Sequence, residues 1–252
     1  MKQLMFALAV FIVSYNFSVA QSAGNYKLTF TEDATELQKY FLIGTTKAIN
    51  GDHEGAIQDF SKAIELDPND ASGYLARADS RSSIEDYQGA LDDYNKAIIL
   101  SHRNSKLNLY CRRGNVKLKL QDYRGAIEDY NQEIKLNPKD AESYCQRGLS
   151  KTKLEDHRGA IEDYNIAIKL SPKVAVLYSN RGLEKNMIRD YRGALQDFNQ
   201  AIKIDPNNAT AYSGRGVAKY RTNDKNGACL DWSKAGELGD ESAYENIRNV
   251  CQ

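Results

Sequence analysis

The chain has 252 residues, and its 34 basic and 34 acidic side chains give a formal net charge of zero. This balance argues against a nucleic-acid surface, because such a surface needs a clustered basic excess. A hydrophobic content of 41% with only 4 prolines argues against a disordered chain. The composition therefore indicates a folded globular protein without a nucleic-acid partner.

The chain begins with an apolar run of ten residues, Leu4 to Val13, which follows Lys2 and precedes Ser18-Val19-Ala20. A basic start, a short apolar core and small residues at the last and third-last places are typical of a secretory signal. An uncleaved anchor is the alternative, but a bilayer span needs about 20 apolar residues. We therefore predict a signal peptide over 1–20 with cleavage after Ala20, a secreted or periplasmic location, and no transmembrane segment after cleavage.

A nine-residue stretch, Asp122 to Tyr130, recurs in close copies along most of the chain. Its glycine returns at intervals of 34, 36, 34, 34 and 34 residues, at Gly55, Gly89, Gly125, Gly159, Gly193 and Gly227. A fixed period in this range is the sequence signature of a solenoid. The longer interval places two extra residues near Ser101–Lys106, which predicts either a flexing point or a harmless surface insertion.

Each unit carries the signals of two helices. An aspartate three residues before each glycine predicts a helix N-cap, at Asp52, Asp86, Asp122, Asp156, Asp190 and Asp224. An apolar stripe then follows at helical spacing, for example at Ala160, Tyr164 and Ala167. We expect another helix earlier in each unit, beginning near a tyrosine such as Tyr144, with a small residue such as Gly148 four positions on.

Two helices per 34 residues, with Tyr144, Gly148, Ala160, Tyr164 and Pro172 at their places in one unit, resemble the tetratricopeptide repeat. The resemblance implies an all-α, right-handed superhelical solenoid whose first helices line a concave groove for peptides or partner proteins. The expected parts are a lead-in segment, 21–36; six helix-turn-helix repeats, 37–70, 71–106, 107–140, 141–174, 175–208 and 209–242; and a C-terminal capping helix, 243–252. Within the lead-in, Lys27–Phe30 is compatible with either an extended piece or a coil.

The resemblance also implies which side chains line the groove. They are Phe41, Thr45, Leu75, Asp79, Cys111, Asn115, Cys145, Leu149, Lys153, Ser179, Leu183, Met187, Tyr220 and Arg221. This mixed surface suits an extended polypeptide, whose side chains we expect to bury against Phe41, Leu75, Leu149 or Leu183. Relatives that hold chaperone C-termini use a lysine and asparagine clamp, and this sequence departs from that pattern because the clamp positions hold no lysine.

A charge pattern accompanies the repeats. Aspartate precedes the aromatic residue of each second helix, and arginine precedes the small residue of each first helix except in the first repeat, which has Ile43. Since the first repeat has no predecessor, we predict that each aspartate pairs with the arginine of the following repeat, from Asp59 with Arg77 to Asp197 with Arg215. Their expected role is to hold register between repeats.

Four cysteines in an exported chain suggest bridging. If the terminal segment folds back at Leu238-Gly239-Asp240, Cys251 comes opposite Cys229, so we predict a disulfide between them; the alternative for Cys229 is a small core residue. Cys111 and Cys145 hold equivalent places on adjacent first helices, about 8 to 10 Å apart. That spacing exceeds the reach of a disulfide, and we predict two free thiols.

We find no catalytic constellation, metal site or cofactor motif in the sequence. His53, His102 and His157 have no cysteine or histidine at ligand spacing, and we interpret all three as surface residues. The sequence therefore predicts a non-enzymatic scaffold with a protein or peptide partner, in the style of bacterial envelope proteins. The alternatives are a module that binds envelope glycans or small ligands through tyrosines, and a self-assembling structural protein.

Overall fold

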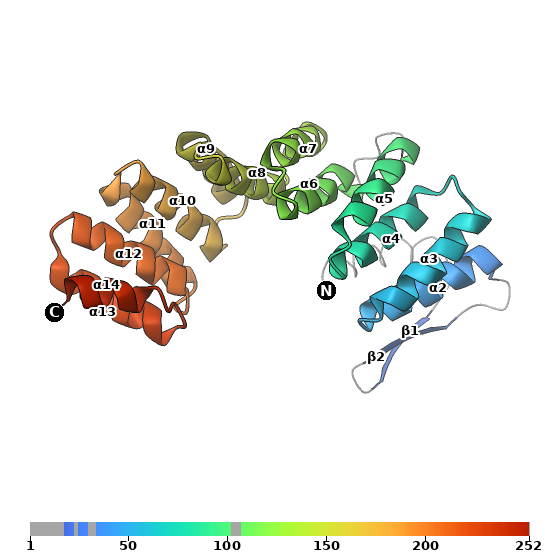
Figure 1. Cartoon of the computed structure of the whole chain (residues 1–252), viewed down its shortest axis with the longest axis horizontal. Coiled ribbons are helices and arrows are strands. Elements are labelled where there is room, and N and C mark those ends of the chain that lie inside the picture. The colour runs from blue at the N-terminus through green and yellow to red at the C-terminus, as the bar shows by residue number, and fades with distance from the viewer. Residues whose placement is uncertain (1–17, 23–24, 30–33, 102–106, 252) are drawn as a thin grey trace. The chain divides into compact units, whose positions relative to one another are not determined.

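The structure, a computed structural model, describes residues 18–22, 25–29, 34–101 and 107–251 (Figure 1). This part of the chain contains two short strands and thirteen helices, and it confirms the all-α repeat fold. The bounds are β1 (Ser18–Ser22), β2 (Asn25–Thr29), α2 (Glu36–Ile49), α3 (His53–Leu66), α4 (Ala71–Ser83), α5 (Tyr87–Leu100), α6 (Leu109–Lys119), α7 (Tyr123–Leu136), α8 (Ala141–Lys153), α9 (His157–Leu170), α10 (Ala175–Met187), α11 (Tyr191–Ile204), α12 (Ala209–Arg221), α13 (Lys225–Glu237) and α14 (Ala243–Val250).

The helices form two compact units, residues 1–122 and 123–252. Within the first unit, α2 to α5 each pack against the next helix in the chain, and α7 to α13 do the same within the second. Even-numbered helices from α2 to α12 are the first helices of the repeats, and odd-numbered helices from α3 to α13 are the second helices. The boundary between the units falls inside the third predicted repeat.

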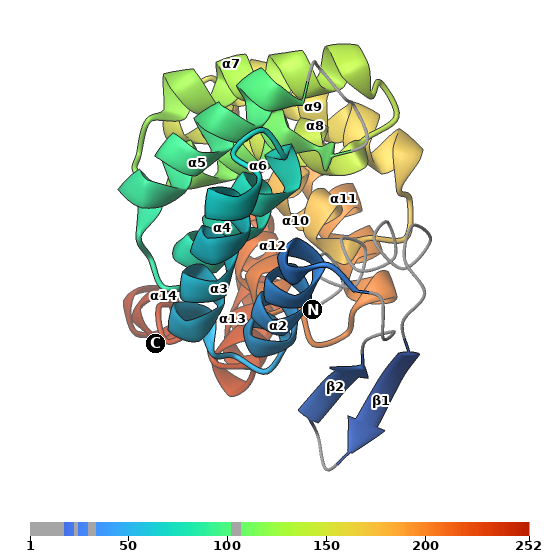
Figure 2. The ribbon, with the colours of Figure 1, turned by 90° about the vertical axis from the view of Figure 1, so that its right-hand side faces the viewer.

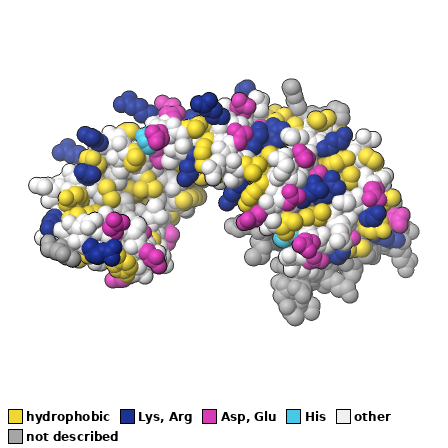
Figure 3. All heavy atoms as spheres, viewed as in Figure 1, with side chains coloured by type: hydrophobic (Ala, Val, Ile, Leu, Met, Phe, Trp, Pro, Cys, Tyr) yellow, Lys and Arg dark blue, Asp and Glu magenta, His cyan; other side chains and the backbone are white. Residues whose placement is uncertain are grey.

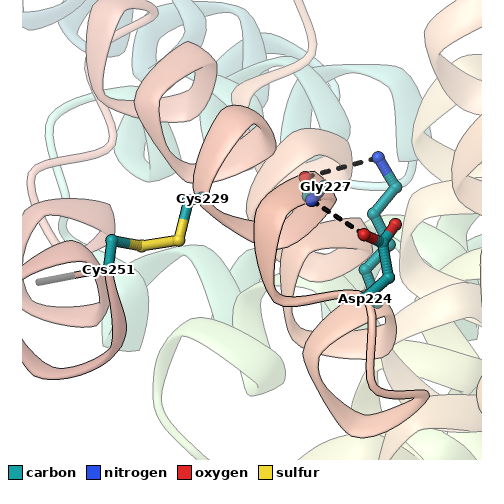
Figure 4. Close-up of a disulfide and its surroundings, with 5 residues drawn as sticks. Asp224, Gly227, Cys229 and Cys251 are labelled. Atoms are coloured by element: carbon teal, nitrogen blue, oxygen red, sulfur yellow. Dashed lines mark hydrogen bonds between the residues drawn. A yellow bond between two sulfur atoms is a disulfide. The ribbon is translucent and has the colours of Figure 1, made fainter.

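The second helices begin at the predicted aspartates. In five of them, the backbone N–H of the repeated glycine donates to the aspartate carboxylate at 2.8–3.0 Å, for example from Gly227 to Asp224 at the start of α13 (Figure 4). This bond satisfies one of the orphan donors that open a helix. Glycine leaves room for this bond, because a Cβ on Gly227 would displace the Asp224 carboxylate from its present position.

The core forms where the aromatic residue of each second helix meets the small residue of the preceding first helix. Tyr164, Phe198 and Trp232 are buried. A Cβ on Gly148 would approach the Tyr164 ring to 3.0 Å, and one on Gly216 would approach the Trp232 ring to 2.6 Å. The predicted small residues are therefore packing residues, since any larger side chain would separate the two helices.

The first helices begin earlier than the sequence suggested. Helix α4 starts at Ala71 rather than near Tyr74, because the Asp70 carboxylate accepts from the Ser72 N–H and caps the helix there. Asp140 caps α8 in the same way. Only α10 among these neighbours has an apolar residue at the cap, Val174, which makes no side-chain cap bond.

The lead-in segment contains extended structure. Strands β1 and β2 pair antiparallel, Ser18 with Thr29 through Ser22 with Asn25 (Figure 2), and β2 lies beside α2. This settles the open choice at Lys27–Thr29 in favour of a strand. The predicted cleavage point after Ala20 falls within β1, and the remainder of the predicted signal peptide lies outside the described residues, as do 102–106 of the inserted turn.

Helix α14 closes the second unit as the predicted cap. Cys229 of α13 is bonded to Cys251 just after α14, with an S–S distance of 2.01 Å and a Cα–Cα distance of 5.8 Å (Figure 4). Ala243, Ile247 and Val250 of α14 pack with Trp232 in one cluster. The disulfide prediction is confirmed, and the capping helix buries apolar surface that the last repeat would otherwise expose.

Candidate functional site on the first helices

The residues predicted to line a groove differ widely in exposure. Met187 and Tyr220 are 64% and 43% exposed, and Lys153 and Arg221 are exposed as well. Seven others are half-buried: Phe41, Thr45, Asp79, Asn115, Cys145, Leu149 and Leu183. The accessible side chains therefore lie at the C-terminal ends of α8, α10 and α12.

Three of the predicted groove residues are buried: Leu75, Cys111 and Ser179. Leu75 belongs to the core cluster that contains Tyr94, and the Ser179 hydroxyl donates to the Ala175 carbonyl oxygen while accepting from Asn208. Their position in the repeat faces the neighbouring helices rather than solvent. None of these three side chains is exposed in this structure, and their contact with a partner stays a prediction.

Two of the predicted apolar anchors are also engaged in the protein's own packing. Phe41 lies with its ring centroid 5.4 Å from that of Phe60, and Leu183 packs against the cluster around Phe198. These contacts and the burial of Leu75 occupy part of the surface of the three side chains, and their contact with a partner stays a prediction. Leu149 remains half-buried.

Asp79, another predicted groove residue, is held in a polar network. Its carboxylate accepts from the Tyr94 hydroxyl at 2.5 Å and from Arg112 Nη1 at 2.7 Å, which joins α4, α5 and α6. Burial, followed by the Asp79 charge, raises the pKa of Tyr94 well above its ordinary value. Burial opposes the charge on Arg112, but the Asp79 carboxylate keeps the pKa of Arg112 raised. Asp79 thus links the three helices by accepting hydrogen bonds from Tyr94 and Arg112.

The arginine and aspartate pairs are within repeats, not between them as predicted. Arg215 Nε and Nη2 donate to Asp231 at 2.8 and 2.7 Å, and the same fork joins the arginine and aspartate of three other repeats, Arg77 with Asp93, Arg147 with Asp163, and Arg181 with Asp197. In the first repeat, Lys47 lies 2.7 Å from Asp59. Lys47 is therefore the ion-pair partner of Asp59 in the repeat where Ile43 stands in place of the arginine.

The same arginines still connect successive repeats, through their remaining nitrogen. Arg215 Nη1 donates to the Asn199 side chain at 2.7 Å, and Arg77 Nη1 donates to Ser61 at 3.0 Å. Equivalent bonds run from Arg113 to Asn95, from Arg147 to Asn131 and from Arg181 to Asn165. The arginines therefore still link successive repeats, but each one bonds an amide or a hydroxyl of the preceding repeat rather than a carboxylate.

Two histidines are not the surface residues that the sequence suggested. His157 is half-buried at the start of α9, and its Nδ1 lies 2.7 Å from the carboxylate of Glu184 on α10. Glu184 is buried at a place where the fourth repeat has Ser150. His53 is half-buried too. In the sequence, this contact was indicated only by a glutamate, Glu184, at a position where the preceding repeat has the small residue Ser150.

Cys111 and Cys145 are free thiols, as predicted. Burial, with a smaller contribution from Glu142, raises the pKa of Cys145 to about 11. A thiol is nucleophilic only as the thiolate, so this environment disfavours reactivity at neutral pH.

Exposed residues gather at the C-terminal ends of the first helices of the second unit, and we call this set the rim. It comprises the last residues of α8, α10 and α12 and the residues that follow α8 and α10: Lys153, Leu154, Met187, Ile188, Tyr220 and Arg221. Leu154 and Ile188 are 41% and 39% exposed. Helix α10 contacts both α8 and α12, so these positions lie on three neighbouring helices.

Other kinds of site find little support in the described part of the chain. It contains no cluster of three or more histidine, cysteine or acidic side chains arranged to hold a metal ion. No helix among the described residues is long and apolar enough to cross a bilayer. On the face drawn in Figure 3, cationic and acidic side chains are interspersed, in keeping with a net charge of zero.

Comparison with known proteins supports the repeat assignment. A family model described as TPR repeat matches residues 46–82, 114–155 and 190–223, and one described as tetratricopeptide repeat matches 141–174. The comparison with curated proteins gives no match. With its paired helices, its period and these matches, the chain belongs to the tetratricopeptide-repeat family, whose fold is a scaffold for protein–protein interaction.

Solved structures of similar fold include pilF of Pseudomonas aeruginosa, at 18% identity and a TM-score of 0.72, covering 84% of this chain and 96% of that one. YrrB, described as a TPR protein with an unusual peptide-binding site, matches at 23% identity and a TM-score of 0.64, covering 76% and 98%. A tetratricopeptide repeat protein of Parabacteroides merdae matches at 23% and 0.60, covering 88% and 87%. At these identities the likeness concerns the fold.

Proposed function

We propose that this protein is a non-enzymatic scaffold outside the cytoplasm, which binds a peptide segment or protein partner along its first helices. In this family the first helices line a concave groove. The observation that carries the proposal is the rim, where Met187 and Tyr220 are exposed beside Lys153 and Arg221. Exposed apolar groups gathered with polar neighbours are typical of interaction surfaces.

Export is supported by two independent features. The Cys229–Cys251 disulfide favours an oxidising compartment, and the first twenty residues have the pattern of a cleavable signal. Expression of the whole chain in a bacterial host with fractionation of its envelope tests this. N-terminal sequencing is expected to find Gln21 as the first residue of the exported form, and retention of Met1 in the cytoplasmic fraction would contradict export.

The binding surface is tested by crosslinking pull-down from the native envelope fraction. The bait is the whole chain, compared with the double variant Met187→Gln/Tyr220→Gln. The control is Ile166→Gln/Leu230→Gln, which makes matched polar changes at exposed residues of the second helices α9 and α13. Loss of captured partner with the first variant alone supports the proposal, and equal capture by all three proteins would overturn it.

A further inference from the structure

We infer that the rim is a docking site for a short extended segment of a partner protein that carries apolar side chains between acidic ones. This inference rests on the proposed function and specifies the chemistry of the partner. It follows from the apolar and cationic residues that the structure leaves accessible together at the ends of α8, α10 and α12.

The apolar part of the rim lies at the C-terminal ends of consecutive first helices. Leu154 and Ile188 follow α8 and α10 at equivalent positions, Met187 is the last residue of α10, and Tyr220 is the last residue but one of α12. Each of the four is between 39% and 64% exposed. A methionine at the centre suits the packing of varied partner side chains, because its thioether is polarizable and its side chain is flexible.

The cationic part of the rim differs from the other cations of the same helices. Lys151 and Lys219, two residues before Lys153 and Arg221, lie 2.8 and 2.9 Å from the buried carboxylates of the following helices. Lys153 and Arg221 form no ion pair with any described residue. Their charges are therefore available to carboxylates of another molecule.

A structural explanation exists for the cations alone, since positive charges at a helix C-terminus complement the helix dipole. That explanation does not account for Met187 and Ile188, which leave apolar side chains accessible at the end of α10. The combination of apolar centre and cationic flanks is what a segment with apolar centre and acidic flanks would recognise.

The spacing of the helices gives the length of the segment. Packed neighbouring helices lie about 8–10 Å apart, so the rim from α8 to α12 extends about 20 Å. An extended chain rises about 3.3 Å per residue, and a segment of about six residues therefore spans it. We expect an acidic residue near each end, opposite Lys153 and Arg221, and apolar residues between them.

An anionic membrane surface is the other occupant that apolar and cationic groups would suit. The residues that follow Leu154 and Ile188 carry more acidic than basic exposed side chains, which opposes this occupant: they are Glu155, Asp156 and Asp190, with the exposed cation Arg189 between Ile188 and Asp190. A flat bilayer covering the rim would meet these carboxylates as well, whereas a single extended segment follows the helix ends and avoids them. The structure therefore favours the peptide.

Fluorescence anisotropy with blocked synthetic peptides tests the inference on the whole mature chain. The probe is a labelled octapeptide with aspartates near both ends and leucines between them. One comparison peptide replaces the aspartates with lysines, and another replaces the leucines with serines. We expect the acidic, apolar peptide to bind at least about tenfold more tightly than either comparison.

Two protein variants locate the binding. Lys153→Glu/Arg221→Glu is expected to weaken binding by about tenfold or more. Lys169→Glu/Lys203→Glu, which makes the same charge change at exposed lysines of α9 and α11, is expected to leave it unchanged. Equal effects of the two variants, equal binding of the three peptides, or no binding of any would overturn the inference.

The same titration with vesicles of phosphatidylcholine and phosphatidylglycerol examines the membrane alternative. Binding to these vesicles that Lys153→Glu/Arg221→Glu abolishes, with no discrimination among the peptides, would replace the peptide by a lipid surface. If the envelope pull-down still depends on Met187 and Tyr220 while the peptides are not discriminated, the partner chemistry is wrong and the scaffold function stands. If the pull-down does not depend on Met187 and Tyr220 and the peptides are not discriminated, both the scaffold function and the partner chemistry are overturned.

Discussion

At the level of single residues, the repeated arginine of the second to sixth repeats joins several neighbours. Arg215 donates to Asp231 within its repeat and to Asn199 of the preceding one, and its guanidinium lies 5.3 Å from the centroid of the Tyr212 ring. The sequence predicted that arginine and aspartate pair. It predicted the wrong aspartate, that of the preceding repeat, because in a periodic chain Arg77 lies at nearly equal separations from Asp59 and Asp93, and only packing distinguishes them.

We predict that Arg215→Met lowers the free energy of unfolding by about 2–4 kcal/mol, because it leaves the buried Asp231 carboxylate without its bidentate partner. Chemical denaturation measures the loss. Arg221→Met on the same helix is the control, with an expected change within about 0.5 kcal/mol since Arg221 is exposed.

The double variant Arg215→Met/Asp231→Leu examines the cause. Removing both charges is expected to recover much of the stability, since the cost lies in a buried carboxylate that keeps only Lys219 as an ion-pair partner. An Arg215→Met protein as stable as the original chain would show that the fork contributes only register.

At the level of elements, the turns between first and second helices carry backbone strain. Glu85, Gln121, Glu155, Arg189 and Asn223 have φ between +60° and +72°, and the first repeat has Gly51 with φ +88° at the corresponding place. A left-handed conformation costs an L-residue about 1–2 kcal/mol, which glycine avoids. The five non-glycine turns therefore reduce the stability of their repeats.

We predict that Glu155→Gly raises the free energy of unfolding by about 0.5–1 kcal/mol, the relief of strain less the extra entropy of glycine in the unfolded chain. The control is Glu162→Gly in the interior of α9, at an exposed residue, which is expected to lower stability by about 1 kcal/mol. The same substitution is thus expected to raise the free energy of unfolding at one site and to lower it at another seven residues away. Chemical denaturation that shows a change of the same sign at both sites would contradict the assignment of strain.

The terminal helix depends on its disulfide. Helix α14 has only eight residues, fewer than an isolated helix needs for stability in water. We predict that Cys229→Ser/Cys251→Ser lowers stability by about 3 kcal/mol or less, and that amide protection falls first in α14. Undiminished protection of α14 in hydrogen exchange would mean that Ala243, Ile247 and Val250 hold the helix without the covalent bond.

At the level of the whole molecule, the repeat period and the capping aspartates were sufficient to predict the fold. These signals are local in sequence and recur, so each repeat supports the interpretation of the others. The disulfide was also predictable, because a turn at Gly239, which has φ +97°, brings Cys229 opposite Cys251. The early helix starts were not, since Asp70 and Asp140 cap the first helices before their first tyrosine.

The candidate site was predicted less completely. The positions of Lys153, Met187, Tyr220 and Arg221 on the first helices followed from the family resemblance, but side-chain exposure did not. Ser179, for example, is small and polar yet buried, because the neighbouring helix packs against it and Asn208 satisfies its hydroxyl. Exposure depends on the separation of helices, which a repeat pattern does not specify.

Site-specific photo-crosslinking tests the central claim, that a partner polypeptide occupies the first helices, most directly. A benzophenone amino acid is placed at Met187 on α10 or at Ile166 on α9, both exposed apolar residues, and each protein is irradiated in the envelope fraction. We predict a covalent adduct with a partner protein from position 187 and none from position 166. Adducts of the same protein in equal yield from both positions, or from position 166 alone, would contradict the account.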